Sequence, residues 1–146
     1  MHSVWRPSLK PGIEATVLVS NRQDVPLDEA GLASLAERTL MAEGFDHGEL
    51  SLSFVGPPEM EQLHERYAGE PDPTDVLSFP IGEEGLLGDV VVCPEEARRN
   101  NPDLDAELRL LVVHGVLHLL GYAHEDDEDR RVMWAKQTTY SGVASP

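Results

Sequence analysis

Apolar and polar residues alternate in parts of this chain with the period of a β-strand. Residues 50–54, Leu-Ser-Leu-Ser-Phe, alternate strictly, which predicts a strand with one buried face. The β-branched run at residues 16–20 predicts an earlier strand, and residues 76–79 and 89–93 predict two later ones. Glycines within residues 82–88 predict a turn between the last two strands, so that these two strands pair directly.

Between these strands the apolar residues recur every three to four positions, which is the period of an α-helix. One helix is expected from about residue 27 until Gly44 ends it, with five residues on its buried face: Leu32, Leu35, Ala36, Thr39 and Leu40. Pro57 begins a short helix with four residues on one face: Met60, Leu63, His64 and Tyr67. Three more helices are expected, over residues 94–100, from a cap at Asn101 or Asp103 to about Leu120, and over residues 127–138.

This order of elements predicts an α+β (α/β-like) fold, in which a small mixed four-stranded sheet packs with about five helices. The length of 146 residues fits a single domain, residues 1–146, with a substantial core. Residues 1–15 and 141–146 show no periodicity and are expected to be loose termini. The candidate chemistry lies on the helix that ends near Leu120 and on the turn that follows it.

Three histidines at the end of that helix have the spacing of a metal site. His114 and His118 are four residues apart, so their side chains share one helix face, with Cβ atoms about 5–6 Å apart. Gly121 can end the helix with a positive φ, which allows the turn to bring His124 to the same ion. Three neutral imidazoles suit Zn²⁺ and leave a fourth position for water, although the same donors accept nickel, copper or cobalt. Burying three imidazoles without partners would cost free energy, so the pattern favours one metal ion per chain over three packed core histidines.

Gly115 distinguishes this site from that of the zinc peptidases with the same histidine spacing. Those enzymes carry Glu directly after the first histidine as a general base, and here that residue has no side chain. An alkoxide leaving group, as in a phosphodiester, depends less on a protein acid than an amine does. The sequence therefore disfavours peptide hydrolysis, for which another carboxylate, such as Glu125, would have to replace the missing one.

The amino-acid composition indicates the cellular compartment of the protein and limits the kinds of partner that it can bind. The single cysteine, Cys93, can form no intrachain disulfide, and the chain shows no signal core and no membrane-spanning run, so we expect a cytoplasmic protein. A formal net charge of −16, from 27 acidic and 11 basic residues, repels polyanions at long range. Binding to nucleic acid would need a local basic patch, and six arginines could supply one, although each is more often a solvated helix charge: Arg66, Arg98, Arg99, Arg109, Arg130 and Arg131.

Two longer motifs resemble those of a known family. The first is Leu63-His-Glu-Arg-Tyr67 followed by Pro73-Thr-Asp-Val-Leu-Ser-Phe-Pro80. The second is Leu87-Gly-Asp-Val-Val-Val-Cys93 followed by the segment from His114 to His124. Together they resemble the YbeY family of zinc-dependent endoribonucleases, over about residues 16–137.

This resemblance implies a single-strand-specific, zinc-dependent endoribonuclease that matures the 3′ end of small-subunit ribosomal RNA and acts in ribosome quality control. It implies ribosomal RNA and the small ribosomal subunit as partners, without DNA or a membrane. It also implies that one Zn²⁺ is bound by His114, His118 and His124. Two alternatives stay open, a non-catalytic ribosome-biogenesis factor stabilised by its metal and a zinc peptidase without the usual Glu.

The chain departs from the family pattern near the expected RNA contact. The family usually has Arg after the Tyr of the first motif, and that Arg is thought to contact the RNA phosphate, but here the position is Ala68. A lost guanidinium removes a bidentate phosphate contact, which leaves Arg66 as the candidate to replace it. Ala123 likewise replaces the Asp that usually precedes the third histidine. Four further residues are expected to be structural rather than catalytic: Thr74, Asp75 and Asp89 at the predicted strands, and Cys93 as a small buried residue.

Overall fold

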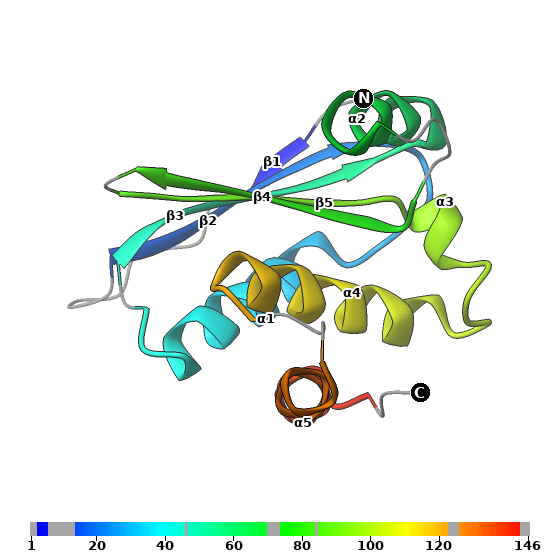
Figure 1. The fold of residues 1–146 in the computed structure, drawn as a ribbon. Coiled ribbons are helices and arrows are strands. Elements are labelled where there is room, and N and C mark those ends of the chain that lie inside the picture. The colour runs from blue at the N-terminus through cyan, green and yellow to red at the C-terminus, as the bar shows by residue number, and fades with distance from the viewer. Residues whose placement is uncertain are drawn as a thin grey trace.

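The computed structural model describes residues 3–5, 14–45, 47–69, 74–83, 85–122 and 126–143, and its strands form one mixed sheet (Figure 1). The sheet has the order β1-β2-β3-β5-β4, with the bounds β1 (Ser3–Trp5), β2 (Glu14–Arg22), β3 (His47–Val55), β4 (Val76–Glu83) and β5 (Leu86–Val92). Strands β2, β3 and β5 run parallel, whereas β1 and β4 pair antiparallel at the two edges. The α+β fold and the direct pairing of the last two strands are therefore confirmed.

Two expectations about the strands were wrong. The sheet has five described strands rather than four, because Ser3–Trp5 in the supposedly loose N-terminal segment pairs with β2, whose own start lies at Glu14. The turn expected over residues 82–88 is much shorter, since β4 continues to Glu83 and β5 begins at Leu86. Antiparallel pairing of β4 with β5 satisfies the backbone of these residues, which outweighs the turn preference of their glycines.

The helices form layers on the two faces of the sheet. Helices α1 (Glu29–Ala42) and α4 (Leu104–Leu119) cover one face, and α5 (Asp127–Ser141) packs against α4 on the side away from the sheet (Figure 1). Helix α2 (Pro57–Ala68) lies alone at one end of the opposite face, and the short α3 (Pro94–Ala97) leads from β5 into α4. The last helix reaches Ser141, three residues beyond the predicted end, and α3 stops earlier than predicted.

Short polar side chains explain where these helices begin. The carboxylates of Asp28, Asp103 and Asp126 accept hydrogen bonds from backbone N–H groups in the first turns of α1, α4 and α5. The five residues predicted to share the buried face of the first helix are all buried: Leu32, Leu35, Ala36, Thr39 and Leu40. Along the predicted face of α2 burial decreases toward the end of the helix, since Met60 is fully buried and Tyr67 is 61% exposed.

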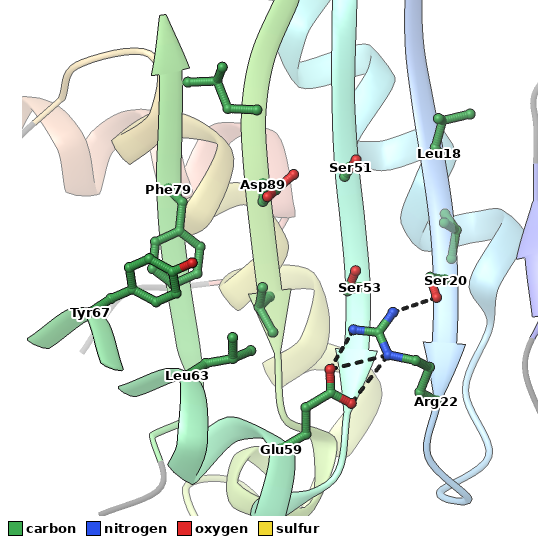
Figure 2. A pocket seen from close by; sticks show the side chains of 13 residues that line it. Leu18, Ser20, Arg22, Ser51, Ser53, Glu59, Leu63, Tyr67, Phe79 and Asp89 are labelled. Atoms are coloured by element: carbon green, nitrogen blue, oxygen red, sulfur yellow. Dashed lines mark hydrogen bonds and ion pairs between the residues drawn. The ribbon is translucent and has the colours of Figure 1, made fainter. Parts of the chain in front are cut away.

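Apolar and polar side chains alternate along β3, so that one face of the sheet is buried and the other is partly exposed to solvent. Leu50, Leu52 and Phe54 are fully buried against α1 and α4. Each such side chain contributes about 1.5–3 kcal/mol relative to an exposed one. Ser51 and Ser53 point to the opposite face, which α2 covers only at one end (Figures 1 and 2). The two faces therefore offer different chemistry.

Candidate metal centre

Two of the three predicted metal ligands lie side by side at the end of α4. The rings of His114 and His118 have centroids 4.7 Å apart and meet edge to face, at 70° between their planes. Both side chains line an open hollow of about 390 Å³ against the edge strand β4, whose lining residues are Val76, Leu77, Ser78 and Pro80. The described part of the chain contains no group of three or more His, Cys, Asp or Glu placed to hold an ion, and the third predicted ligand, His124, lies outside the described residues.

The end of α4 has the predicted geometry. Gly121 adopts a φ of +101°, a region that disfavours residues with a Cβ atom, and its N–H donates to the carbonyl of His118 over 3.0 Å. The chain leaves the helix there, directly before the segment that carries His124. The predicted stop at this glycine is confirmed.

Gly115 is required by the packing of α4 against the sheet. A Cβ atom at this position would lie 2.5 Å from Val90 Cγ1 and 3.3 Å from Ser78 Oγ. The Ser78 hydroxyl donates to the Gly115 carbonyl over 3.0 Å, so the helix sits directly against β4. The position at which the peptidases carry their Glu therefore has no room for a side chain, and the centre has no carboxylate there.

Gln137 on α5 orients the first histidine, a role that the local sequence pattern does not indicate. His114 Nδ1 lies 2.8 Å from Gln137 Oε1, and Gln137 is buried. An amide oxygen only accepts, so Nδ1 carries the proton and Nε2 carries the lone pair that a metal requires. A contact of this kind is the usual way in which a ligating histidine is fixed in one tautomer. The available signal was a polar residue four positions after Met133, on the buried face of the last helix.

Replacing Gln137 with leucine is expected to weaken zinc binding about 10–100-fold, because His114 loses the partner that fixes its tautomer and ring orientation. Gln137→Glu keeps an acceptor oxygen and should retain most of the affinity. Competition with a chromogenic chelator measures the dissociation constant, and thermal unfolding of the metal-free proteins controls for damage to the fold. Equal zinc affinity in wild type and Gln137→Leu would show that this contact does not support the metal.

The candidate arginines do not form a basic patch. Five of them pair with acidic residues three or four positions earlier in the chain: Arg98–Glu95, Arg99–Glu96, Arg109–Asp105, Arg130–Asp127 and Arg131–Glu128. Arg109, Arg130 and Arg131 are the helix charges that the sequence favoured, and Arg98 and Arg99 lie just after α3. Arg66 is exposed in the last turn of α2 and forms no ion pair with any residue that the structure describes. It remains the one candidate of the six for phosphate contact.

Two of the four residues expected to be structural, Cys93 and Asp75, occupy structural positions. Cys93 is fully buried beside Val55 and Met60 under α2, where burial raises the pKa of its thiol. It does not line the hollow of His114 and His118, so it is not placed as a fourth ligand. Asp75 accepts a hydrogen bond from Asn100 Nδ2 over 2.9 Å, and its carbonyl accepts from the N–H of Cys93. These bonds join the start of β4 to residues on either side of α3.

Comparison with known proteins identifies what this arrangement resembles. The family model described as "Endoribonuclease YbeY" matches residues 18–142. The YbeY endoribonuclease of Beutenbergia cavernae is 44% identical over 82% of this chain and 90% of its own length, and that of Thermobifida fusca is 42% identical over 82% and 87%. The solution structure of TM1509 from Thermotoga maritima superposes with a TM-score of 0.57 at 30% identity, over 88% of this chain and 86% of that one. No described helix is long and apolar enough to cross a membrane.

Proposed function

This chain belongs to the YbeY family of endoribonucleases, and we propose that it cleaves single-stranded ribosomal RNA with the help of one zinc ion. Its place of action is the 3′ end of small-subunit ribosomal RNA, during maturation and in the quality control of ribosomes. The observation that carries this proposal is the paired His114 and His118 in an open hollow, within a chain that matches the family over most of its length.

The donor set of the hollow fits zinc. His114 and His118, with His124 from the segment that follows α4 in the sequence, would supply three imidazoles, and members of the family are metal-dependent. Bound zinc supplies a Lewis acid for a phosphoryl oxygen and lowers the pKa of water toward about 7. Gln137 keeps the proton of His114 on Nδ1, and Gly115 supplies no carboxylate base. The chain is therefore suited to a reaction whose leaving group is an alkoxide.

The position of the hollow at a sheet edge favours single strands. One wall is β4, the last strand in the order of the sheet, and the other is the end of α4. A single RNA strand can follow such an edge and present one phosphate to the histidines, whereas a duplex is too stiff to bend around it. Because the candidate arginines other than Arg66 are paired, affinity should depend weakly on phosphate contacts.

Metal removal tests the proposal. A precursor fragment carrying the 3′ end of small-subunit ribosomal RNA should be cleaved by the protein as purified, and a duplex of the same sequence should stay intact. A chelator should stop cleavage, and equimolar zinc should restore it, because no described side chain in the hollow can replace the ion as a Lewis acid. Gel analysis of end-labelled RNA measures both effects.

A non-catalytic role in ribosome biogenesis is the second candidate, and Ala68 together with the paired arginines favours it. Such a protein would bind zinc and small subunits but leave the RNA intact under every metal condition. That result in the cleavage experiment would replace the endoribonuclease proposal.

A further inference from the structure

A second hollow, of about 540 Å³, lies on the sheet face away from α1 and α4 (Figure 2). The floor of this hollow consists of side chains that the register of the paired strands places next to one another. Leu18, Ser51, Asp89 and Phe79 face one another across four neighbouring strands. In the next row Ser20 stands beside Ser53. Polar groups from β2, β3 and β5 therefore gather at the centre of the hollow.

An aromatic pair forms one wall of this hollow. Tyr67 from the end of α2 lies against Phe79 of β4, with ring centroids 4.6 Å apart and planes tilted by 47°. Tyr67 is 61% exposed although it is a large ring on the side of its helix that faces the sheet (Figure 2). An exposed ring beside a second ring offers a surface on which a planar group can stack.

The opposite wall of the hollow carries no net charge, because its arginine and its glutamate form an ion pair. The guanidinium of Arg22 donates to both carboxylate oxygens of Glu59, over 2.6 Å at the closest contact, and to Ser20 Oγ over 2.7 Å. Since Arg22 and Glu59 cancel, Asp89 leaves the lining with one net negative charge. The site is therefore unsuited to a phosphate and suited to a neutral group that donates hydrogen bonds.

The centre of the floor offers such a group its acceptors. Among the residues that the structure describes, Asp89, Ser51 and Ser53 side chains take part in no hydrogen bond or ion pair. A carboxylate with both oxygens available can accept two parallel N–H bonds, which is its strongest arrangement. Among the four RNA bases, guanine alone places two N–H donors, N1–H and the N2 amino group, side by side on one edge.

We infer that this hollow binds a guanine base of single-stranded RNA, with the ring stacked at Tyr67 and Phe79 and its donor edge on Asp89. The inference rests on the proposed function, because it takes RNA as the ligand. Both hollows are lined by β4, whose alternate residues Phe79 and Ser78 point to opposite faces of the sheet. One RNA strand that passes around this edge can reach both sites, so cleavage should fall at a fixed short offset from a guanosine.

The test is a titration of the full-length protein with guanosine, inosine, adenosine and uridine 5′-monophosphates, followed through the ring NMR signals of Tyr67 and Phe79. Guanosine monophosphate should bind about tenfold tighter than the adenosine and uridine compounds, and inosine monophosphate, which lacks the N2 donor, should lie between them. Asp89→Asn should abolish this order, because the amide offers one acceptor oxygen and one mismatched donor.

Because Tyr67 is exposed, two substitutions at this residue can test the inference without disturbing the core. Tyr67→Ala should weaken binding of all four compounds about tenfold, whereas Tyr67→Phe keeps the ring and should bind like wild type. Equal affinities for the four compounds, or a guanosine preference that survives Asp89→Asn, would overturn the inference. If Asp89→Asn does not fold, the inosine comparison and the Tyr67 pair decide.

Failure of this inference is distinguishable from failure of the proposed function. The precursor-cleavage assay runs in parallel on the same wild-type preparation. Cleavage without a guanosine preference removes the guanine site and leaves the endoribonuclease proposal standing. A guanosine preference without cleavage under any metal condition supports the site and removes the proposed activity.

Discussion

His118→Ala is expected to lose both stoichiometric zinc and RNA cleavage. His118 is the second imidazole of the pair on α4, and its ring meets that of His114 at 4.7 Å between centroids. A three-histidine site that loses one ligand binds its ion far more weakly, because the remaining donors no longer enclose it. Loss of several kcal/mol of charge stabilisation corresponds to a reaction at least about 10³-fold slower.

The measurement combines zinc per chain, by elemental analysis, with single-turnover cleavage of the precursor RNA. His64→Ala is the matched control, since His64 is a half-buried histidine on α2, away from the hollow that His114 and His118 line. The control should keep its zinc and its rate. A His118→Ala protein that retains one zinc per chain and cleaves RNA normally would show that the metal is bound elsewhere.

The periodicity of the sequence correctly predicted those elements whose structure depends on residues close to one another along the chain. The face of α1 was predicted correctly because burial repeats every three to four residues along one helix. Strand β1 was missed, since three residues become a strand only by pairing with β2, which the local pattern does not encode. The turn was predicted too long because Gly88 looks like a turn residue. Within β5 it instead lies where a Cβ atom would be 2.3 Å from the carbonyl oxygen of Phe79.

The same distinction separates the two parts of the candidate site. The pairing of His114 with His118 follows from four-residue spacing on a helix, which a sequence displays directly. Gln137 contacts His114 across 23 positions, and this contact exists only because α5 packs against α4. The hollow at Asp89 depends on the register of four strands, and a shift of one residue in any of them would send its side chains to the other face.

Glu43→Gln is expected to lower the free energy of unfolding at pH 7 by about 1.5–3 kcal/mol, the range for hydrogen bonds to a charged group. The side chain of Glu43 is only 6% exposed and lies at the end of α1. It accepts hydrogen bonds from Tyr122, in the turn after α4, and from Tyr140 and Lys136 on α5, the latter over 2.9 Å. An amide keeps one acceptor oxygen and leaves the ammonium of Lys136 without its counter-ion.

The pH dependence of that loss identifies its cause. Burial alone would raise the pKa of Glu43, but the hydrogen bonds from Tyr122, Tyr140 and Lys136 outweigh it and hold the pKa below its ordinary value of 4.5. A carboxylate whose pKa is lowered by folding stabilises the protein above its unfolded value and loses that contribution as the pH falls through the folded value. The difference between wild type and Glu43→Gln should therefore be largest near pH 7 and shrink below pH 4.5.

Urea unfolding at several pH values measures this difference, and Glu37→Gln on the same helix is the matched control. Glu37 forms no hydrogen bond or ion pair with any residue in the described ranges, so its replacement should change stability little at any pH. A difference for Glu43→Gln that stayed constant down to pH 3 would mean that the amide disturbs packing rather than charge. In that case the network of Glu43 would not be what holds α5, and with it Gln137, against the histidines of α4.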